Sequence, residues 1–268
     1  MTHAFSLPSD LVLTPRPSAR VTCTLTRALL RRCDGHATLA EVARQLPFPA
    51  ALALAIFGLW EILVKAGVLS AHLYGYPSGI AARIVALVAS GELFVHAGVT
   101  AFAAIMGFAL GSLIGSFAGL CLWLNETVAR TVRPFIVAIN GVPKIAFAPL
   151  IIVWFGIGIE SKIAIAAALT FIVSLIATYN GTLETDKDLL RLMRSLGATR
   201  LQAWRKVVIP AALPWILSTL RLNVGFALIG AVVGEYISSE RGLGYLVYYS
   251  GVLYDLNGVW AGIVALMV

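Results

Sequence analysis

The chain has 268 residues, of which 59% are hydrophobic and only 12% are charged. An average soluble domain carries roughly a quarter charged residues, so these charges are too few to cover a water-facing surface, and we expect membrane lipid to contact much of the chain. The formal net charge is +7, but no basic stripe interleaved with aromatic residues occurs, which argues against a nucleic-acid partner.

Residues 1–46 are polar and basic and lack the short apolar core of a secretory signal peptide. We therefore expect them to form a cytoplasmic N-terminal segment. Residues 47–268 are expected to form a transmembrane domain, because a helix needs ~20 mostly apolar residues to cross the bilayer core. The expected fold class is all-α, a polytopic transmembrane helical bundle of about six spans.

The candidate spans follow one another along this domain. They are 47–69, a part of 93–125, 134–155, 163–183, 209–233 and an apolar run from residue 258 to Val268. The last run is about half as long as a span needs. Either its helix begins earlier, across Asp255 and Asn257, or the chain is truncated, and truncation is the interpretation we favour.

The distribution of Lys and Arg predicts the orientation, because these residues collect in loops that stay in the cytoplasm. Most of them lie in residues 1–46, 126–133 and 184–208, which share one side of the membrane if the N-terminus is inside. The segments on the other side hold only Lys65, Arg83, Lys162 and Arg241. We expect a multi-pass protein of the cytoplasmic membrane, with its N-terminus in the cytoplasm.

The second candidate span carries four glycines at a spacing of four: Gly107, Gly111, Gly115 and Gly119. Such a strip on one helix face lets another helix backbone approach closely. The approaching helix belongs either to a second copy of the chain or to the same subunit. Packing within the subunit is the interpretation we favour.

A long loop of helical pattern, residues 184–210, separates two candidate spans. Asp186 and Asp188 place acidic groups where a helix begins. The apolar residues that follow fall at i, i+3, i+4 and i+7: Leu189, Leu192, Met193 and Leu196. The pattern predicts a short helix with one apolar face.

The loop also contains signals for a helix end and a second helix start. Gly197 suits the left-handed conformation that ends a helix, and Thr199 and Gln202 have the spacing of a capping box. Pro210 marks the entry into the next span. The amphipathic helix either docks on a cytoplasmic partner or lies on the membrane surface, with its basic residues facing lipid phosphates.

Gly197 is followed by nine residues and then by Val207, Val208, Ile209 and Pro210, a register that resembles the signature of permease subunits in binding-protein-dependent ABC importers. The segment 191–193, Arg-Leu-Met, stands where that signature has Glu-Ala-Ala. From about residue 55 onward, further segments resemble the nitrate/sulfonate/taurine branch of the family: residues 140–150, 154–158, 194–198, 210–214 and 242–245, with the pairs Ser161-Lys162, Leu220-Arg221 and Gly234-Glu235.

The resemblance implies a type I ABC importer permease fold in a bacterial inner membrane. It implies three partners: an ABC ATPase subunit docked on the loop, a second permease copy forming a homodimer, and an extracytoplasmic substrate-binding protein. No G-x-x-x-x-G-K-[ST] pattern occurs, so no cofactor is expected in this chain, and the partner would bind ATP and Mg. The residues expected to couple to the ATPase are Leu189, Arg191, Leu192, Met193, Arg194, Leu196, Gly197, Ala198, Gln202 and Pro210.

Polar residues inside the candidate spans are candidates for the translocation pathway, because ionisable groups at membrane depth usually face protein or water. Pro143 and Pro149 are expected to break the third span and free backbone groups there. Lys144 and Arg221 could contact an anionic solute; the alternatives are a structural Arg221 and Glu235 and a snorkelling Lys144. The full candidate set is Asn140, Pro143, Lys144, Asn180, Arg221, Asn223 and Glu235.

The predicted function is ATP-driven import of a small anionic solute such as a sulfonate, taurine or nitrate. A pyrimidine or thiamine-precursor solute is an alternative within the family. An ATP-independent secondary transporter is the alternative outside it, although no inverted repeat of the kind such transporters contain is apparent. We do not expect an enzyme or a metal site, because the four histidines form no H-E-x-x-H motif.

Overall fold

The structure is a computed structural model that describes residues 47–268, with side chains described from residue 51. The described residues form helices and no strands, which confirms the all-α prediction. The helices are α3 (Pro47–Lys65), α4 (Ala71–Tyr74), α5 (Pro77–Ala89), α6 (Glu92–Leu122), α7 (Glu126–Gly141), the short 3-10 helix η1 (Lys144–Phe147), α8 (Ala148–Phe155), α9 (Ile159–Leu183), α10 (Lys187–Ser195), α11 (Arg200–Ala203), the π-helix η2 (Trp204–Val208), α12 (Ile209–Ile237), α13 (Leu243–Val252) and α14 (Leu256–Met267).

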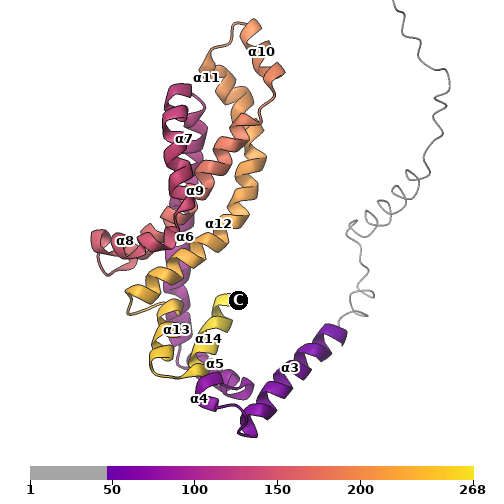
Figure 1. Cartoon of the computed structure of the whole chain (residues 1–268), viewed down its shortest axis with the longest axis vertical. Helices are drawn as coiled ribbons and strands as arrows, with labels where there is room; N and C mark the ends of the chain where they lie inside the picture. The colour runs from indigo at the N-terminus through magenta and orange to yellow at the C-terminus, as the bar shows by residue number, and fades with distance from the viewer. Residues whose placement is uncertain (1–46) are drawn as a thin grey trace, which may run out of the picture. The chain divides into compact units, whose positions relative to one another are not determined.

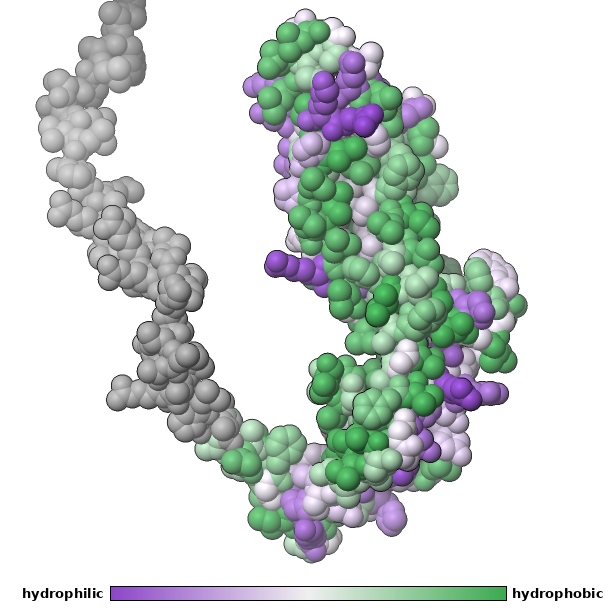
Figure 2. All heavy atoms as spheres, turned by 180° about the vertical axis from the view of Figure 1, so that it is seen from behind, coloured by the Kyte–Doolittle hydropathy of each residue, from purple (hydrophilic) through white to green (hydrophobic). Residues whose placement is uncertain are grey.

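Three long helices, α6, α9 and α12, form the core of the compact unit Trp60–Val268. Each belongs to a helical stretch that is long and apolar enough to cross a membrane. Their outward flanks stay apolar, with Leu113, Leu217 and Leu222 each more than half exposed. Figure 2 shows this hydrophobic flank, with hydrophilic residues gathered at the end formed by α10 and α11.

The four glycines of α6 pack against α9 in the same chain. A methyl group added at Gly107 would meet Ala166, whereas one added at Gly119 would lie 2.7 Å from the carbonyl oxygen of Leu175. Successive glycines meet successively later residues of α9, so the two helices run parallel. The structure thereby confirms packing within the subunit, at a separation that only glycine permits.

Helix α12 runs antiparallel to α9. Its Gly230 packs on Ala166, and Gly234, one turn later, packs on Lys162, one turn earlier in α9. The loop that contains α10 and α11 therefore lies at one end of the core, where α6 and α9 end and α12 begins (Figure 1). The two basic segments 126–133 and 184–208 start from this end, as predicted, and Lys162 and Arg241 lie at the other.

The predicted third span is broken into α7 and a pair formed by η1 and α8, with an angle of 92° between them. The break follows Gly141, at Val142 and Pro143, as expected. Pro149, however, lies in the first turn of α8, where its missing N–H removes no helical hydrogen bond. Of the two prolines expected to break the span, Pro143 is therefore the one that lies at the bend. Helix α8 projects sideways from the core (Figure 1).

At the end remote from α10, the short helices α5, α13 and α14 pack on the beginning of α6. Their contact buries Leu87, Leu243, Leu246 and Ala261. The last helix begins at Leu256, earlier than residue 258, because Asp255 accepts a hydrogen bond from the Gly258 amide at 3.0 Å and caps it. Helices α5 and α13 were not predicted from the sequence. The predicted segment 1–46 lies outside the described residues, and the domain boundary after residue 46 stays a prediction.

Candidate functional site

The predicted amphipathic helix of the 184–210 loop is α10. It begins after Asp186, whose carboxylate accepts a hydrogen bond from the Asp188 amide at 2.8 Å. It ends at Gly197, which has a φ of 74°. The amide of Gly197 donates to Arg194 and that of Ala198 to Met193, so the last carbonyls are satisfied by a left-handed cap.

The predicted capping box opens α11. The hydroxyl of Thr199 accepts from the Gln202 amide at 3.3 Å, and the side-chain oxygen of Gln202 accepts from the Thr199 amide at 2.8 Å. The helix continues through one π-helical turn into α12, whose first turn contains Pro210. The loop is thus connected to the core by one continuous helical stretch, Arg200–Ile237.

Three of the four residues on the apolar face of α10 are exposed, and Met193 is half-buried. Leu189 is 48% exposed, Leu192 54% and Leu196 72%. Arg191 pairs with Asp188 at 2.9 Å beside them, and Arg194 lies on the same short helix. An apolar patch with basic residues around it, held on a capped helix at the end of the molecule, has the character of a docking surface.

Two contacts that the sequence analysis missed fasten the loop to the end of α6. The guanidinium of Arg200 donates to the Trp123 carbonyl at 2.9 Å and lies 5.4 Å from the Trp123 ring centroid. The indole of Trp204 donates to the Leu120 carbonyl at 2.9 Å. Between this anchor and α10 lies a hollow of about 390 Å³, lined by Glu126 and Arg194 among others.

Among the predicted pathway residues, Asn223 is buried at the centre of the core. Its amide nitrogen donates to Ser112 of α6 at 2.9 Å and to Ser174 of α9 at 2.6 Å, and it lies 3.3 Å from the Thr170 carbonyl oxygen. The side chain is fully buried. Asn223 therefore connects all three core helices.

Glu235 occupies a second buried cluster. Its carboxylate accepts from the Thr100 hydroxyl at 2.8 Å and from the Gly244 amide at 2.7 Å. Thr100 in turn accepts from the Leu243 amide at 2.8 Å. These bonds connect α6, α12 and the first turn of α13. They agree with a structural role for Glu235, which was one of the alternatives.

The remaining candidates lie apart from these clusters. Lys144 donates to Asn140 at 3.0 Å across the bend after α7, next to Pro143. Asn180 and Arg221 are exposed. The structure brings Asn140, Pro143 and Lys144 together and separates the other four, so a shared role in translocation stays a prediction.

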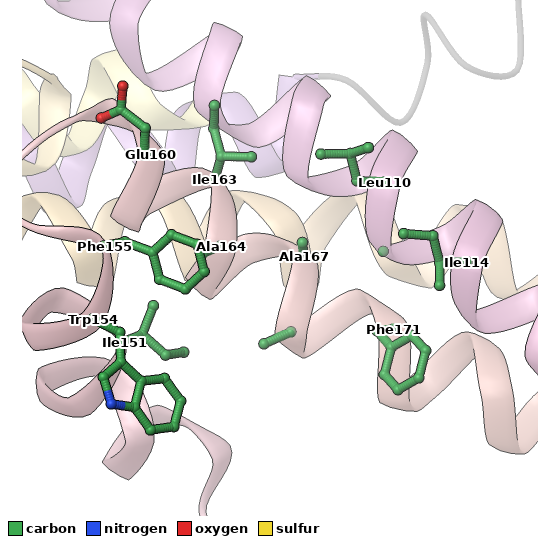
Figure 3. Close-up of a pocket in the computed structure, with 12 residues that line it drawn as sticks. Leu110, Ile114, Ile151, Trp154, Phe155, Glu160, Ile163, Ala164, Ala167 and Phe171 are labelled. Carbon is green, nitrogen blue, oxygen red and sulfur yellow. The ribbon is translucent and has the colours of Figure 1, made fainter.

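An apolar pocket of about 650 Å³ lies between α8, α9 and α6. Figure 3 shows Phe155 and Ile151 of α8 beside Ala164 of α9, with Leu110 and Ile114 of α6 farther along. Glu160 is the one ionisable residue that lines it, and it offers no positive group to anchor an anionic ligand. No cluster of His, Cys, Asp and Glu that could hold a metal occurs among the described residues, and the prediction of no cofactor in this chain stays a prediction.

Comparisons with known proteins agree with this arrangement. Residues 111–268 match the family "Binding-protein-dependent transport system inner membrane component". The chain is 34% identical to the formylaminopyrimidine transport permease protein ThiX of Halalkalibacterium halodurans, over 80% of this chain and 85% of the relative. It is also 34% identical to the aliphatic sulfonates transport permease protein SsuC of Bacillus subtilis, over 78% of this chain and 76% of the relative.

A solved structure shows the same fold. A chain of the methionine ABC transporter MetNI, in an inward-facing conformation, superposes with a TM-score of 0.55 at 23% identity, over 63% of this chain and 85% of that chain. The predicted type I permease fold is thus confirmed, and the aliphatic sulfonate permeases among the relatives agree with the predicted branch. The chain belongs to the family of binding-protein-dependent transport system inner membrane components and is a permease subunit of an ABC importer, not an enzyme.

Proposed function

We propose that this permease imports a small anionic solute of the sulfonate, taurine or nitrate type and that the 184–210 loop couples it to a separate ATPase. The exposed apolar face of α10 supports the coupling role most directly. A docking helix needs unpaired apolar side chains on a rigid support, and α10 has both. Membrane-surface packing remains the competing role for this face.

In the proposed assembly, two copies of the chain form the pathway. The family implies an ATPase and a substrate-binding protein as partners. Docking of the ATPase on α10 places that end of the core in the cytoplasm. The opposite end, with Lys162 and Arg241, then faces the binding protein. The N-terminus is proposed to be cytoplasmic and the protein to lie in a bacterial inner membrane, in contact with its lipids.

The solute proposal rests on the aliphatic sulfonate permeases of Bacillus subtilis and Escherichia coli, which are 34% and 32% identical to this chain. A second candidate solute is a formylaminopyrimidine-like precursor, favoured by the equally high identity of ThiX. Because the chain belongs to this family, an ATP-independent secondary transporter is no longer an alternative. Uptake assays with the binding protein that serves this permease separate the two: competition by an alkanesulfonate supports the first, and competition by a formylaminopyrimidine alone contradicts it.

Gly197→Arg tests the coupling role. The substitution places an L side chain at a φ of 74°, which costs roughly 1–2 kcal/mol and displaces α10. We expect the ATPase no longer to co-purify with the permease and uptake to be lost, while the protein stays in the membrane.

The matched control is Gly91→Arg. Gly91 has a φ of 78°, and, like Gly197, it has nothing within 4 Å of an added Cβ. It imposes the same backbone strain at the other end of the core. Retention of the ATPase by Gly197→Arg, or equal loss in both variants, would rule out docking through α10.

A further inference from the structure

A small polar hollow lies at the beginning of α9, at the end of the core remote from α10. Its volume is about 360 Å³. The residues that give it its chemistry are Gly158, Ile159, Lys162, Ser238, Glu240 and Arg241. None of them belongs to the loop or to the predicted pathway set.

Lys162 is a buried cation in this hollow. Its side chain is only 5% exposed, and its stem packs against Gly234 of α12. Within the described part of the chain, its ammonium group takes part in no hydrogen bond or ion pair. Because no carboxylate contacts this ammonium group directly, it can still form an ion pair with a bound anion.

Ser238 provides a second unsatisfied group at the same place. Its hydroxyl oxygen is buried and has no hydrogen-bond partner among the described residues. Ser238 follows the last turn of α12, and its backbone amide is already used by the Gly234 carbonyl. Within the described chain no other group therefore competes for the hydrogen bond of this hydroxyl.

The N-terminus of α9 adds a positive electrostatic potential, which favours an anion. Gly158 and Ile159 line the hollow, and α9 continues for 25 residues. The first amides of a long helix carry a positive partial charge and bind anions. Arg241, from the segment after α12, brings a second full positive charge to the same space.

Three carboxylates lie near, and none neutralises these cations by contact. The carboxylate of Glu235 is held by Thr100 and Gly244. Glu160 lines the apolar pocket on the α8 side of α9. Glu240 lines the hollow itself, but among the described residues it forms no ion pair with Lys162 or Arg241.

We propose that this hollow binds the anionic group of a small ligand, a sulfonate, carboxylate or phosphate. Lys162 and Arg241 supply the charge, and the Ser238 hydroxyl and the first amides of α9 supply hydrogen bonds. Binding of an anion here follows from these residues alone. Its use by the transported solute, as it enters from the binding protein, rests on the proposed function. A phosphate group of a lipid presents the same chemistry.

The test titrates the purified full chain, in neutral detergent, with sodium methanesulfonate at constant ionic strength and follows its thermal unfolding. We expect a saturable rise in Tm. Lys162→Gln should weaken the apparent affinity about tenfold and Ser238→Ala about fivefold, as expected for a charge-assisted and a single hydrogen bond. Ser238→Ala breaks no bond within the described chain, so it and Arg241→Gln decide the outcome if Lys162→Gln does not fold.

Arg133→Gln is the matched control, because it removes one exposed positive charge from α7 outside the hollow. It should keep the full response. A response that never saturates, or one that Ser238→Ala and Arg241→Gln leave unchanged, overturns the site.

Two further measurements identify the source of the anion and its role. Repeating the titration in phosphatidylcholine and in phosphatidylglycerol nanodiscs distinguishes a lipid headgroup from a free solute. Loss of the response only with the anionic lipid assigns the site to a headgroup. Persistence of the response in both lipids assigns it to a free solute. Because anion binding is measured without the ATPase, a failure of the coupling proposal leaves the anion-binding proposal intact. A Ser238→Ala transporter with unchanged KM for uptake would overturn only the role in solute entry.

Discussion

At the scale of single residues, the 184–210 loop is held by caps between neighbours in the sequence and by anchors between distant residues. The cap at Gly197 and the box formed by Thr199 and Gln202 depend on neighbours within a few positions, and the structure confirms both. The anchors Arg200–Trp123 and Trp204–Leu120 join residues more than seventy positions apart. No spacing rule connects such pairs, so sequence reasoning missed them.

Asn223 gives a test at this scale. Asn223→Ala removes the donor that serves Ser112 and Ser174 and should lower the free energy of unfolding by about 1–3 kcal/mol. Denaturant unfolding in detergent measures the change. Asn180→Ala, on the exposed face of α9, is the control and should have no effect. An unchanged stability for Asn223→Ala, with altered solute selectivity, would favour the pathway role instead.

At the scale of helices, hydropathy predicted the long elements and misjudged the short ones. The apolar runs in α6, α9 and α12 are long enough for a span, so their helices were found with nearly correct ends. Helices α5 and α13 have 13 and 10 residues and fall below the length on which span prediction depends. Only the structure, through their packing against other helices, identifies them.

The parallel contact of α6 and α9 makes a prediction of its own. Gly115→Ala should destabilise the protein, because the added methyl meets the Ser174 Cβ at 2.9 Å and the Phe171 carbonyl even closer. Gly98→Ala, in the same helix with no atom within 4 Å, should instead stabilise it by up to about 1 kcal/mol, the difference in helix propensity. Thermal unfolding of the two variants should therefore change in opposite directions; a gain for both would show that α6 can move away from α9.

At the scale of the whole molecule, the basic segments 126–133 and 184–208 were correctly assigned to one end of the core, because the charge pattern reflects chain topology rather than contacts. The membrane side of that end is a prediction that labelling can check. In a cysteine-free background, Ser195→Cys on α10 should react with a membrane-impermeant maleimide only after cells are opened. Ser90→Cys, exposed between α5 and α6, should react in intact cells. The reverse pattern would invert the proposed orientation.

The bend after α7 has a consequence for hydration. Because α6 and α9 run in the same direction, the chain between them must return across the membrane. Helix α7 has 16 residues, or about 24 Å at 1.5 Å per residue, which is less than the ~30 Å hydrocarbon layer. The non-helical backbone around Pro143 therefore falls at bilayer depth, where exposed peptide groups are tolerated only beside protein or water. A water-filled recess reaching Asn140 and Lys144 from one surface would meet that requirement, and it would leave the membrane locally thin at the place where the chain turns.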